Sequence, residues 1–203
     1  MRQPEAGTPA RETPPGPAAP PGLVNIANAL TVARLLLVPL FVWLLLAGGT
    51  AYRIAAFAIF ALASVTDLLD GHLARRRNLI TDFGKIADTT ADKALTGSAL
   101  VTLSALGQLP WWVTVVILVR ELGVTALRFW VIRRGVIAAT RGGKIKMVLQ
   151  VIAISLYVLP GPLGVAREVT MALAVVATVV TGADYVGRAV RLHRAVPHHE
   201  TGR

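Results

Sequence analysis

Residues 66–93 read TDLLDGHLARRRNLITDFGKIADTTADK and carry five of the eleven acidic residues in a chain of 203. Asp67 and Asp70 are three residues apart, and Asp88 and Asp92 are four apart, so each pair shares one face if its segment is helical. One helix running into Arg75–Arg77 and another beginning at Asp82 would form a hairpin whose facing surfaces hold these four carboxylates. Because such carboxylates repel one another and attract divalent cations, the stretch predicts a metal site.

The composition is typical of a membrane protein. Hydrophobic residues make up 54% of the chain and charged residues only 16%, and the mean hydropathy is +0.61. This composition is too apolar for a soluble domain of the same length, and it allows several membrane spans. Cysteine is absent, which excludes disulfides and thiolate metal ligands. The net charge of +10 points to lipid head groups and not to nucleic acid, because no basic face is interleaved with aromatic residues.

The apolar segments predict an all-α integral membrane protein with six transmembrane helices around a polar cavity that opens to the cytoplasm. The helices are expected at about residues 25–47, 52–75, 83–106, 111–132, 144–159 and 165–190. We expect residues 1–22 to be a disordered, Pro-rich cytoplasmic tail, residues 23–192 to be the helical domain, and residues 193–203 to be a basic cytoplasmic tail. No signal peptide precedes the first span, so we expect that span to be retained.

The distribution of basic residues predicts the orientation. Most lysines and arginines outside the spans fall on the side that holds both termini and the acidic stretch, whereas Arg53 and Arg167 fall on the other side. The positive-inside rule therefore places both termini and the carboxylates at the cytoplasmic face of the inner cell membrane. In the first span, Thr31 and Arg34 belong to a polar stripe that either faces the cavity or lets Arg34 reach the membrane surface.

The acidic stretch follows the pattern D-x2-D-G-x2-A-R-x8-G-x3-D-x3-D over residues 67–92. This pattern resembles the signature of the CDP-alcohol phosphatidyltransferase family at every fixed position. The resemblance implies that CDP-diacylglycerol is the donor and CMP the leaving group. It also implies that the incoming alcohol attacks the lipid-side phosphorus directly, without a covalent enzyme intermediate.

The resemblance also implies roles for individual residues. Asp92 would be the general base, and two Mg²⁺ or Mn²⁺ ions would be held by Asp67, Asp70, Asp88 and Asp92; oxygen ligands favour these metals over zinc. Binding of CDP-diacylglycerol would involve Asp70, Gly71, Ala74, Arg75 and Gly84, although ordinary helix packing also accounts for the small residues. The resemblance also implies that the protein forms a homodimer within the lipid membrane.

Basic residues in the second half of the chain favour a phosphorylated acceptor. The candidate phosphate-binding residues are Arg120, Thr125, Arg128, Arg141, Lys144 and Lys146. Membrane topology alone could also account for the last three, and Glu121 is a candidate partner for Arg128 inside the membrane.

Longer stretches, among them VRELGVTALR and GGKIKMVLQ, resemble the bacterial branch of the family that makes phosphatidylglycerophosphate from sn-glycerol 3-phosphate. Inositol phosphate and phosphatidylglycerol are the alternative acceptors. An ion-coupled transporter with intramembrane carboxylates is the alternative outside the family. The sequence leaves the role of Asp184 and Tyr185 open, between supporting the cavity and capping the last helix.

Overall fold

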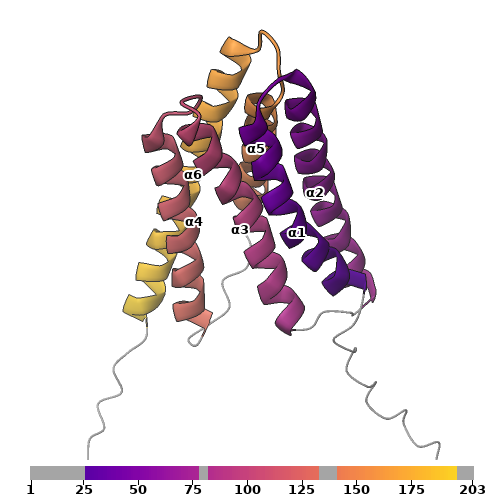
Figure 1. Ribbon diagram of the computed structural model, residues 1–203. Helices are drawn as coiled ribbons and strands as arrows, with labels where there is room; N and C mark the ends of the chain where they lie inside the picture. The colour runs from indigo at the N-terminus through magenta and orange to yellow at the C-terminus, as the bar shows by residue number, and fades with distance from the viewer. Residues whose placement is uncertain (1–25, 78–81, 133–140, 196–203) are drawn as a thin grey trace, which may run out of the picture.

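The computed structural model describes residues 26–77, 82–132 and 141–195, which form six α-helices (Figure 1). The helices are α1 (Ile26–Ala47), α2 (Thr50–Arg77), α3 (Asp82–Ala105), α4 (Trp111–Ile132), α5 (Arg141–Val158) and α6 (Gly164–Ala195). The side chains of residues 26–29, 68–77, 82–88, 128–132, 141, 189 and 192–195 lie outside the description. The predicted all-α fold is confirmed.

Successive helices run in opposite directions through a single bundle (Figure 1). Helices α1, α3 and α5 begin at one end, which we call the cavity end, and α2, α4 and α6 end there. The opposite end, which holds the short connections at residues 48–49, 106–110 and 159–163, is the far end. Helix α1 packs against α2 and α3, and α6 packs against α4 and α5. Helix α2 therefore ends, and α3 begins, at the cavity end.

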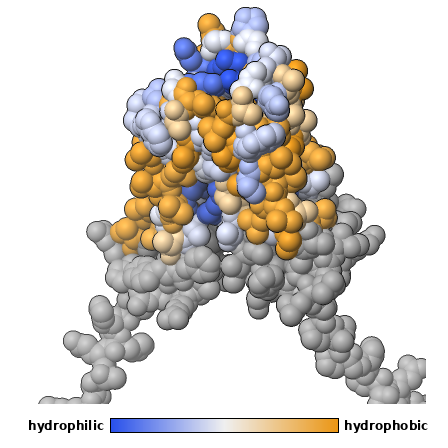
Figure 2. All heavy atoms as spheres, viewed as in Figure 1, coloured by the Kyte–Doolittle hydropathy of each residue, from blue (hydrophilic) through white to orange (hydrophobic). Residues whose placement is uncertain are grey.

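The outer surface of the bundle is apolar. Helices α1, α2 and α6 contain stretches long and apolar enough to cross a membrane, at Leu30–Ala47, Thr50–Asp67 and Gly164–Arg188. Helices α3, α4 and α5 have 24, 22 and 18 residues. Their sequences also include charged residues, some of which lie between the helices. Figure 2 shows a broad hydrophobic band interrupted by a narrow hydrophilic gap. The chain is therefore a membrane protein whose α3, α4 and α5 helices carry charged groups between them.

The buried apolar core occupies the half of the bundle nearer the far end. The rings of Phe41 on α1 and Phe60 on α2 lie 5.7 Å apart, and both are fully buried. Leu100, Ile117 and Ile154 bring α3, α4 and α5 into the same cluster. Between α3 and α4, buried hydroxyl groups are hydrogen-bonded to each other. Large apolar side chains fill this half, whereas the two cavities described below contain polar and charged side chains.

Two arginines at the far end satisfy the backbone carbonyls at the end of α5. The last carbonyls of a helix have no partner within it and need donors from elsewhere. Arg53 donates to the carbonyls of Tyr157 and Val158 at 2.5 and 3.0 Å, and to Gln108 Oε1 at 2.8 Å. Arg167 donates to the carbonyls of Leu156 and Leu159 at 2.8 and 2.5 Å. Both arginines therefore stabilise the end of α5.

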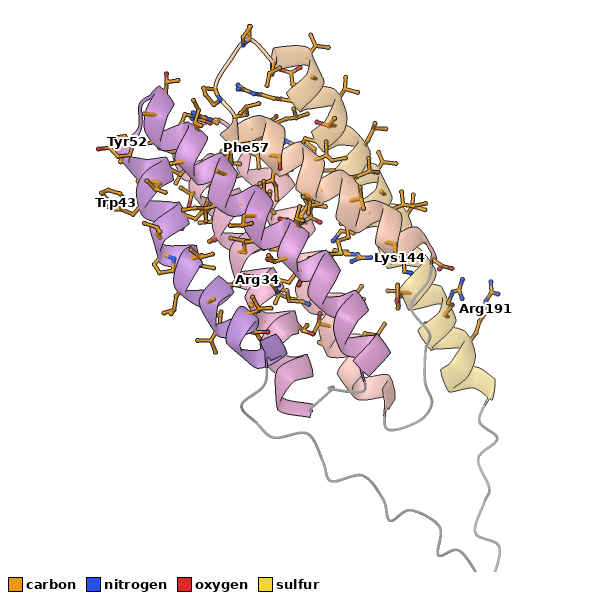
Figure 3. All side chains as sticks on the ribbon, turned by 90° about the vertical axis from the view of Figure 1, so that its right-hand side faces the viewer. Arg34, Trp43, Tyr52, Phe57, Lys144 and Arg191 are labelled. Atoms are coloured by element: carbon orange, nitrogen blue, oxygen red, sulfur yellow. The ribbon has the colours of Figure 1, made fainter. Side chains whose placement is uncertain are left out.

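Glycines allow the tight turns at this end. Gly48 and Gly49, between α1 and α2, have φ of 72° and 82°, and Gly107 after α3 has φ of 69°. These values lie in the left-handed region, which residues with a Cβ adopt only at a cost. Trp43 and Tyr52, on either side of the first turn, pack edge to face with ring centroids 5.9 Å apart (Figure 3).

Candidate active site

The four aspartates of the acidic stretch lie on the two helices predicted for them. Asp67 and Asp70 are on α2, and Asp88 and Asp92 are on α3. The side chains of Asp67 and Asp92 are described; those of Asp70 and Asp88 are not, and Gly71, Ala74, Arg75 and Gly84 lie outside the described side chains too. Within the described residues, no three acidic or histidine side chains are grouped closely enough to hold a metal ion. The four-carboxylate metal site therefore stays a prediction.

Arg34 on α1 points into the bundle and pairs with Asp67. Its Nη1 donates to Asp67 Oδ1 at 2.6 Å, and only 3% of the arginine side chain is exposed. Thr31, one turn earlier, is also buried. The polar stripe of α1 thus faces the interior, and Arg34 does not extend along the helix to the membrane surface. The guanidinium holds one Asp67 oxygen in a defined place beside α2.

A cavity of about 240 Å³, the outer cavity, lies between α3 and the later helices. Asp92 and Lys93 of α3 face residues of α4, α5 and α6 across it. The remaining lining residues are Arg120, Glu121, Val124, Thr125, Gly143, Lys144, Lys146, Met147 and Tyr185. Four of the lining side chains are cationic and two are carboxylates. Figure 3 shows Lys144 and Arg34 at similar heights along the bundle, so the cavity and the Arg34–Asp67 pair occupy the same layer.

An ion-pair network fixes two of these cations. Lys146 Nζ and Arg120 Nη1 both donate to Glu121 Oε1, the latter at 2.7 Å. Arg120 Nη2 donates in addition to Thr181 Oγ1 on α6 at 2.7 Å. A Cβ on Gly182 would meet Arg120 Cγ at 3.1 Å, so the absence of a side chain there lets the arginine lie against α6. The network therefore joins α4, α5 and α6 around one carboxylate.

The remaining charged groups that line the cavity have no such partners among the described residues. Asp92 accepts no hydrogen bond from another described residue, and Lys93 and Lys144 form no ion pair within the described part of the chain. Lys144 is exposed, whereas Lys146 is 6% exposed. The outer cavity thus offers a carboxylate on one wall and available cations beside it, an arrangement suited to an anionic ligand that carries a hydroxyl group.

Four of the six predicted acceptor-binding residues line this cavity: Arg120, Thr125, Lys144 and Lys146. Arg128 and Arg141 lie outside the described side chains. Glu121, a candidate partner of Arg128 in the sequence analysis, takes Arg120 and Lys146 as its partners among the described residues. Thr125 Oγ1 donates to the Glu121 carbonyl at 2.7 Å, so its hydrogen is used within α4.

Tyr185 is a cavity residue for which the sequence analysis left the role open. It is 5% exposed and lines the outer cavity, whereas neighbouring Asp184 faces outward and pairs with Arg188 at 3.0 Å. The spacing of positions along α6 distinguishes the two residues. Positions 171, 174, 178 and 182 are buried at steps of three to four residues, and Tyr185 continues this series whereas Asp184 does not. Lys93, Gly143 and Met147 were also not among the predicted site residues.

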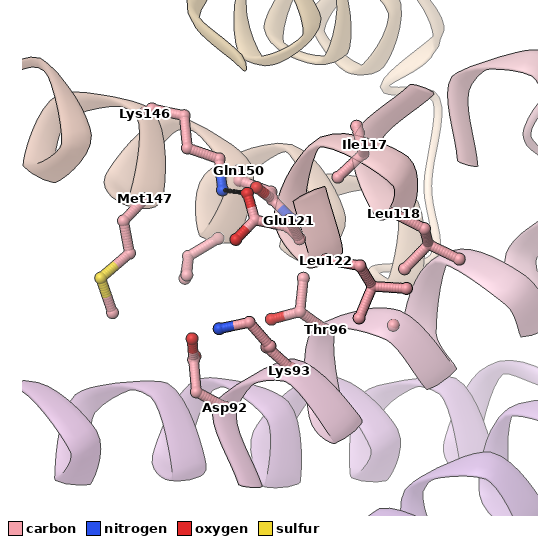
Figure 4. Close-up of a pocket in the computed structure, with 12 residues that line it drawn as sticks. Asp92, Lys93, Thr96, Ile117, Leu118, Glu121, Leu122, Lys146, Met147 and Gln150 are labelled. Carbon is pink, nitrogen blue, oxygen red and sulfur yellow. Dashed lines mark hydrogen bonds and ion pairs between the residues drawn. The ribbon is translucent and has the colours of Figure 1, made fainter. Parts of the chain in front are cut away.

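A second, smaller cavity of about 70 Å³, the inner cavity, continues from the first towards the core. The two share the walls formed by Asp92, Lys93, Glu121, Lys146 and Met147. The residues that line the inner cavity alone include polar Thr96 and Gln150, and the others among them carry no polar side chain. Figure 4 shows Glu121 between Lys146 above and the α3 residues Asp92, Lys93 and Thr96 below.

Comparison with known proteins identifies the family. The family model described as CDP-alcohol phosphatidyltransferase matches residues 24–180. The chain belongs to this family. It is therefore a phosphatidyltransferase and not a transporter, as the acidic stretch predicted, and the matched region spans all of α1 to α5 and half of α6.

Individual relatives point to one branch of the family. The chain is 57% identical over 174 residues to a "Probable phosphatidylglycerophosphate synthase" of Mycobacterium tuberculosis strain H37Rv, and the alignment covers 83% of each chain. It is 39% identical over 184 residues to the "CDP-diacylglycerol--glycerol-3-phosphate 3-phosphatidyltransferase" of Bacillus subtilis strain 168, covering 82% of this chain and 95% of the relative. A Shigella flexneri protein with the same name is 37% identical over 163 residues, 77% of this chain and 88% of its own.

Proposed function

We propose that the protein transfers the phosphatidyl group of CDP-diacylglycerol to sn-glycerol 3-phosphate, giving phosphatidylglycerophosphate and CMP. The observation that carries the acceptor assignment is the charge of the outer cavity. Its four cations and two carboxylates leave a formal charge of +2, which matches the dianion of a phosphate monoester. The names of the relatives agree with this acceptor.

The acceptor would lie across the outer cavity, with its phosphate group near Arg120, Lys144 and Lys146 and a terminal hydroxyl at Asp92. Asp92 would take the hydroxyl proton as the oxygen attacks the lipid-side phosphorus of the donor. The new P–O bond forms as the bond to the CMP phosphate breaks, and CMP leaves with the electron pair. Arg128 and Arg141 are proposed to add to the phosphate site.

Divalent metal ions fit the donor set of α2 and α3. Asp67 and Asp92, the two described members, are both partly buried carboxylates, and carboxylate oxygens are the ligands that Mg²⁺ and Mn²⁺ prefer. With Asp70 and Asp88, they would hold two ions. Bound there, the metals would neutralise the phosphate oxygens of the donor during displacement. Arg34 would orient Asp67 for this role, as partners of ligating carboxylates generally do.

The donor would bind along α2 and the start of α3. These segments contain the predicted donor-binding residues Asp70, Gly71, Ala74, Arg75 and Gly84. Residues 23–192 would form the catalytic domain, with tails at residues 1–22 and 193–203. The domain would lie in the inner cell membrane with both termini cytoplasmic, because the basic residues gather at the cavity end. It would function as a homodimer.

The test is CMP release by the purified protein with CDP-diacylglycerol, Mg²⁺ or Mn²⁺, and a panel of acceptors. The panel contains glycerol 3-phosphate, inositol 1-phosphate, serine and phosphatidylglycerol. We expect turnover with glycerol 3-phosphate and its loss on chelation of the metal. Turnover with another acceptor alone would keep the family chemistry and overturn the acceptor assignment, whereas undiminished turnover without metal would overturn the metal assignment.

A further inference from the structure

Two residues that line the inner cavity, Gln150 and Glu121, each have a side-chain oxygen that accepts no hydrogen bond from the described residues. Gln150 on α5 is 3% exposed, and its Oε1 is buried without a hydrogen-bond partner in the described part of the chain. Glu121 uses Oε1 for both Lys146 and Arg120, and none of the described residues donates to its Oε2. Buried polar groups in native proteins are nearly always hydrogen-bonded, so the unpaired Gln150 oxygen beside this cavity indicates a ligand or water that supplies a donor.

The inner cavity fits small hydroxyl-bearing groups. Its volume of about 70 Å³ is enough for a few water molecules or for a hydroxyl-bearing carbon. Most of its wall is apolar, from Ile117, Leu118 and Leu122 of α4 and Val151 of α5. Away from the four charged residues that it shares with the outer cavity, the wall disfavours a charged group, and Gln150 and Glu121 offer oxygen acceptors. A neutral alcohol satisfies both conditions.

The position of the inner cavity relative to Asp92 identifies which alcohol group reaches it. Asp92 and Glu121 line both cavities, so both lie where the outer cavity passes into the inner one. A terminal hydroxyl at Asp92 and a phosphate among the outer cations leave the middle carbon of a three-carbon acceptor between them. Its hydroxyl is the donor that can turn towards Glu121 and Gln150.

We propose that the inner cavity is a hydroxyl subsite, in which Glu121 Oε2 and Gln150 Oε1 accept hydrogen bonds from the acceptor hydroxyl adjacent to the attacking one. This inference rests on the proposed function and deepens it, because it makes the enzyme selective for a vicinal diol phosphate. An acceptor that lacks the second hydroxyl would bury both acceptor oxygens unpaired, which sites built to bind a hydroxyl strongly disfavour.

The test compares glycerol 3-phosphate with 3-hydroxypropyl phosphate, which has the same phosphate and terminal hydroxyl but no middle hydroxyl. Initial rates of CMP release give kcat/KM for each acceptor, and their ratio cancels the fraction of folded enzyme. We expect the unmodified protein to favour glycerol 3-phosphate by about 100-fold. In Gln150→Met, which keeps the volume and removes the acceptor oxygen, the ratio should fall to about 10-fold or less.

The matched control is Thr178→Val on α6. Thr178 is fully buried, its Oγ1 also has no partner among the described residues, and it lines neither cavity. The ratio of the two kcat/KM values in Thr178→Val should equal that of the unmodified protein. If Gln150→Met is inactive, Gln150→Glu, which keeps an acceptor oxygen, should retain the preference for glycerol 3-phosphate.

The outcomes separate the inference from the proposed function. A ratio near one in the unmodified protein, an unchanged ratio in Gln150→Met, or an equal fall in Thr178→Val overturns the hydroxyl subsite while glycerol 3-phosphate remains a substrate. Turnover of neither acceptor, with turnover of a different alcohol in the panel above, overturns the proposed acceptor itself and the subsite with it.

Discussion

The two ends of the bundle use arginine in opposite ways. At the far end, Arg53 and Arg167 donate mainly to backbone carbonyls at the end of α5. In the half nearer the cavity end, Arg34 and Arg120 donate to the side-chain carboxylates of Asp67 and Glu121. The far-end arginines complete a helix terminus, whereas the others orient carboxylates around a cavity.

This difference teaches where ligand chemistry is possible. A guanidinium bound to main-chain carbonyls cannot be released without exposing the helix end, so it is structural. Cations that share one carboxylate, as Arg120 and Lys146 do, retain donors for an incoming anion. Four substitutions, taken from the largest expected effect to the smallest, can break or sharpen this distinction.

Asp92→Asn should give the largest loss. The amide keeps the size of the side chain and cannot accept the hydroxyl proton, so kcat should fall by about 10³-fold or more, with donor binding largely retained. Initial rates of CMP release and a donor-binding titration measure the two quantities. Asp184→Asn is the matched control, because Asp184 is exposed and its partner among the described residues is Arg188, and it should leave both quantities unchanged. Near-normal turnover by Asp92→Asn would show that another group is the base.

Arg120→Met should raise the acceptor KM by about 10- to 100-fold, because a charge-assisted donor near the acceptor phosphate is lost. It also removes the hydrogen bond to Thr181. Acceptor titrations of CMP release at saturating donor measure this KM. An unchanged KM would place the acceptor phosphate away from the Arg120–Glu121–Lys146 network.

Arg53→Met is the counterpart at the far end. It should lower the stability of the protein and leave the acceptor KM unchanged. Three hydrogen bonds are lost there, at a cost of about 1–3 kcal/mol in the free energy of unfolding, so the thermal midpoint in detergent should fall. The acceptor KM of the folded fraction should stay at its original value. A raised KM without loss of stability would contradict the structural role given to this end.

Gly182→Ala should have the smallest effect. The added methyl group would meet Arg120 Cγ at 3.1 Å and force the flexible arginine to shift by a few tenths of an ångström. We expect a rise in acceptor KM of about 2- to 5-fold, equivalent to about 1 kcal/mol or less. Gly187→Ala, on the same helix with open space around it, should leave KM unchanged. Equal KM values in the two variants would mean that Arg120 does not need this close approach.

The sequence predicted the helices well, because they follow from patterns within single segments. Apolar runs located all six helices, and the bounds of α4 were predicted as observed. Helix α5 begins at Arg141, three residues before the predicted start, because its first turn is basic and was assigned to the preceding loop. Helix α6 extends to Ala195 for the same reason: its last turns are basic.

Contacts between helices were harder to predict. Glu121 pairs with Lys146, 25 residues away on α5, and periodicity within α4 alone gives no information on that contact. The capping role of Arg53 was also not expected, because its partners are backbone carbonyls 104 and 105 residues along the chain. Such pairings depend on how the helices pack, which the pattern of any one segment does not determine.

The central claim is that the acceptor hydroxyl, activated at Asp92, attacks the donor directly. Single-turnover CMP release, with enzyme in excess over CDP-diacylglycerol, tests it in the presence and absence of glycerol 3-phosphate. The account predicts no CMP without the acceptor and one phosphatidylglycerophosphate for each CMP with it. A burst of CMP in the absence of acceptor, with the phosphatidyl group retained on the protein, would contradict it.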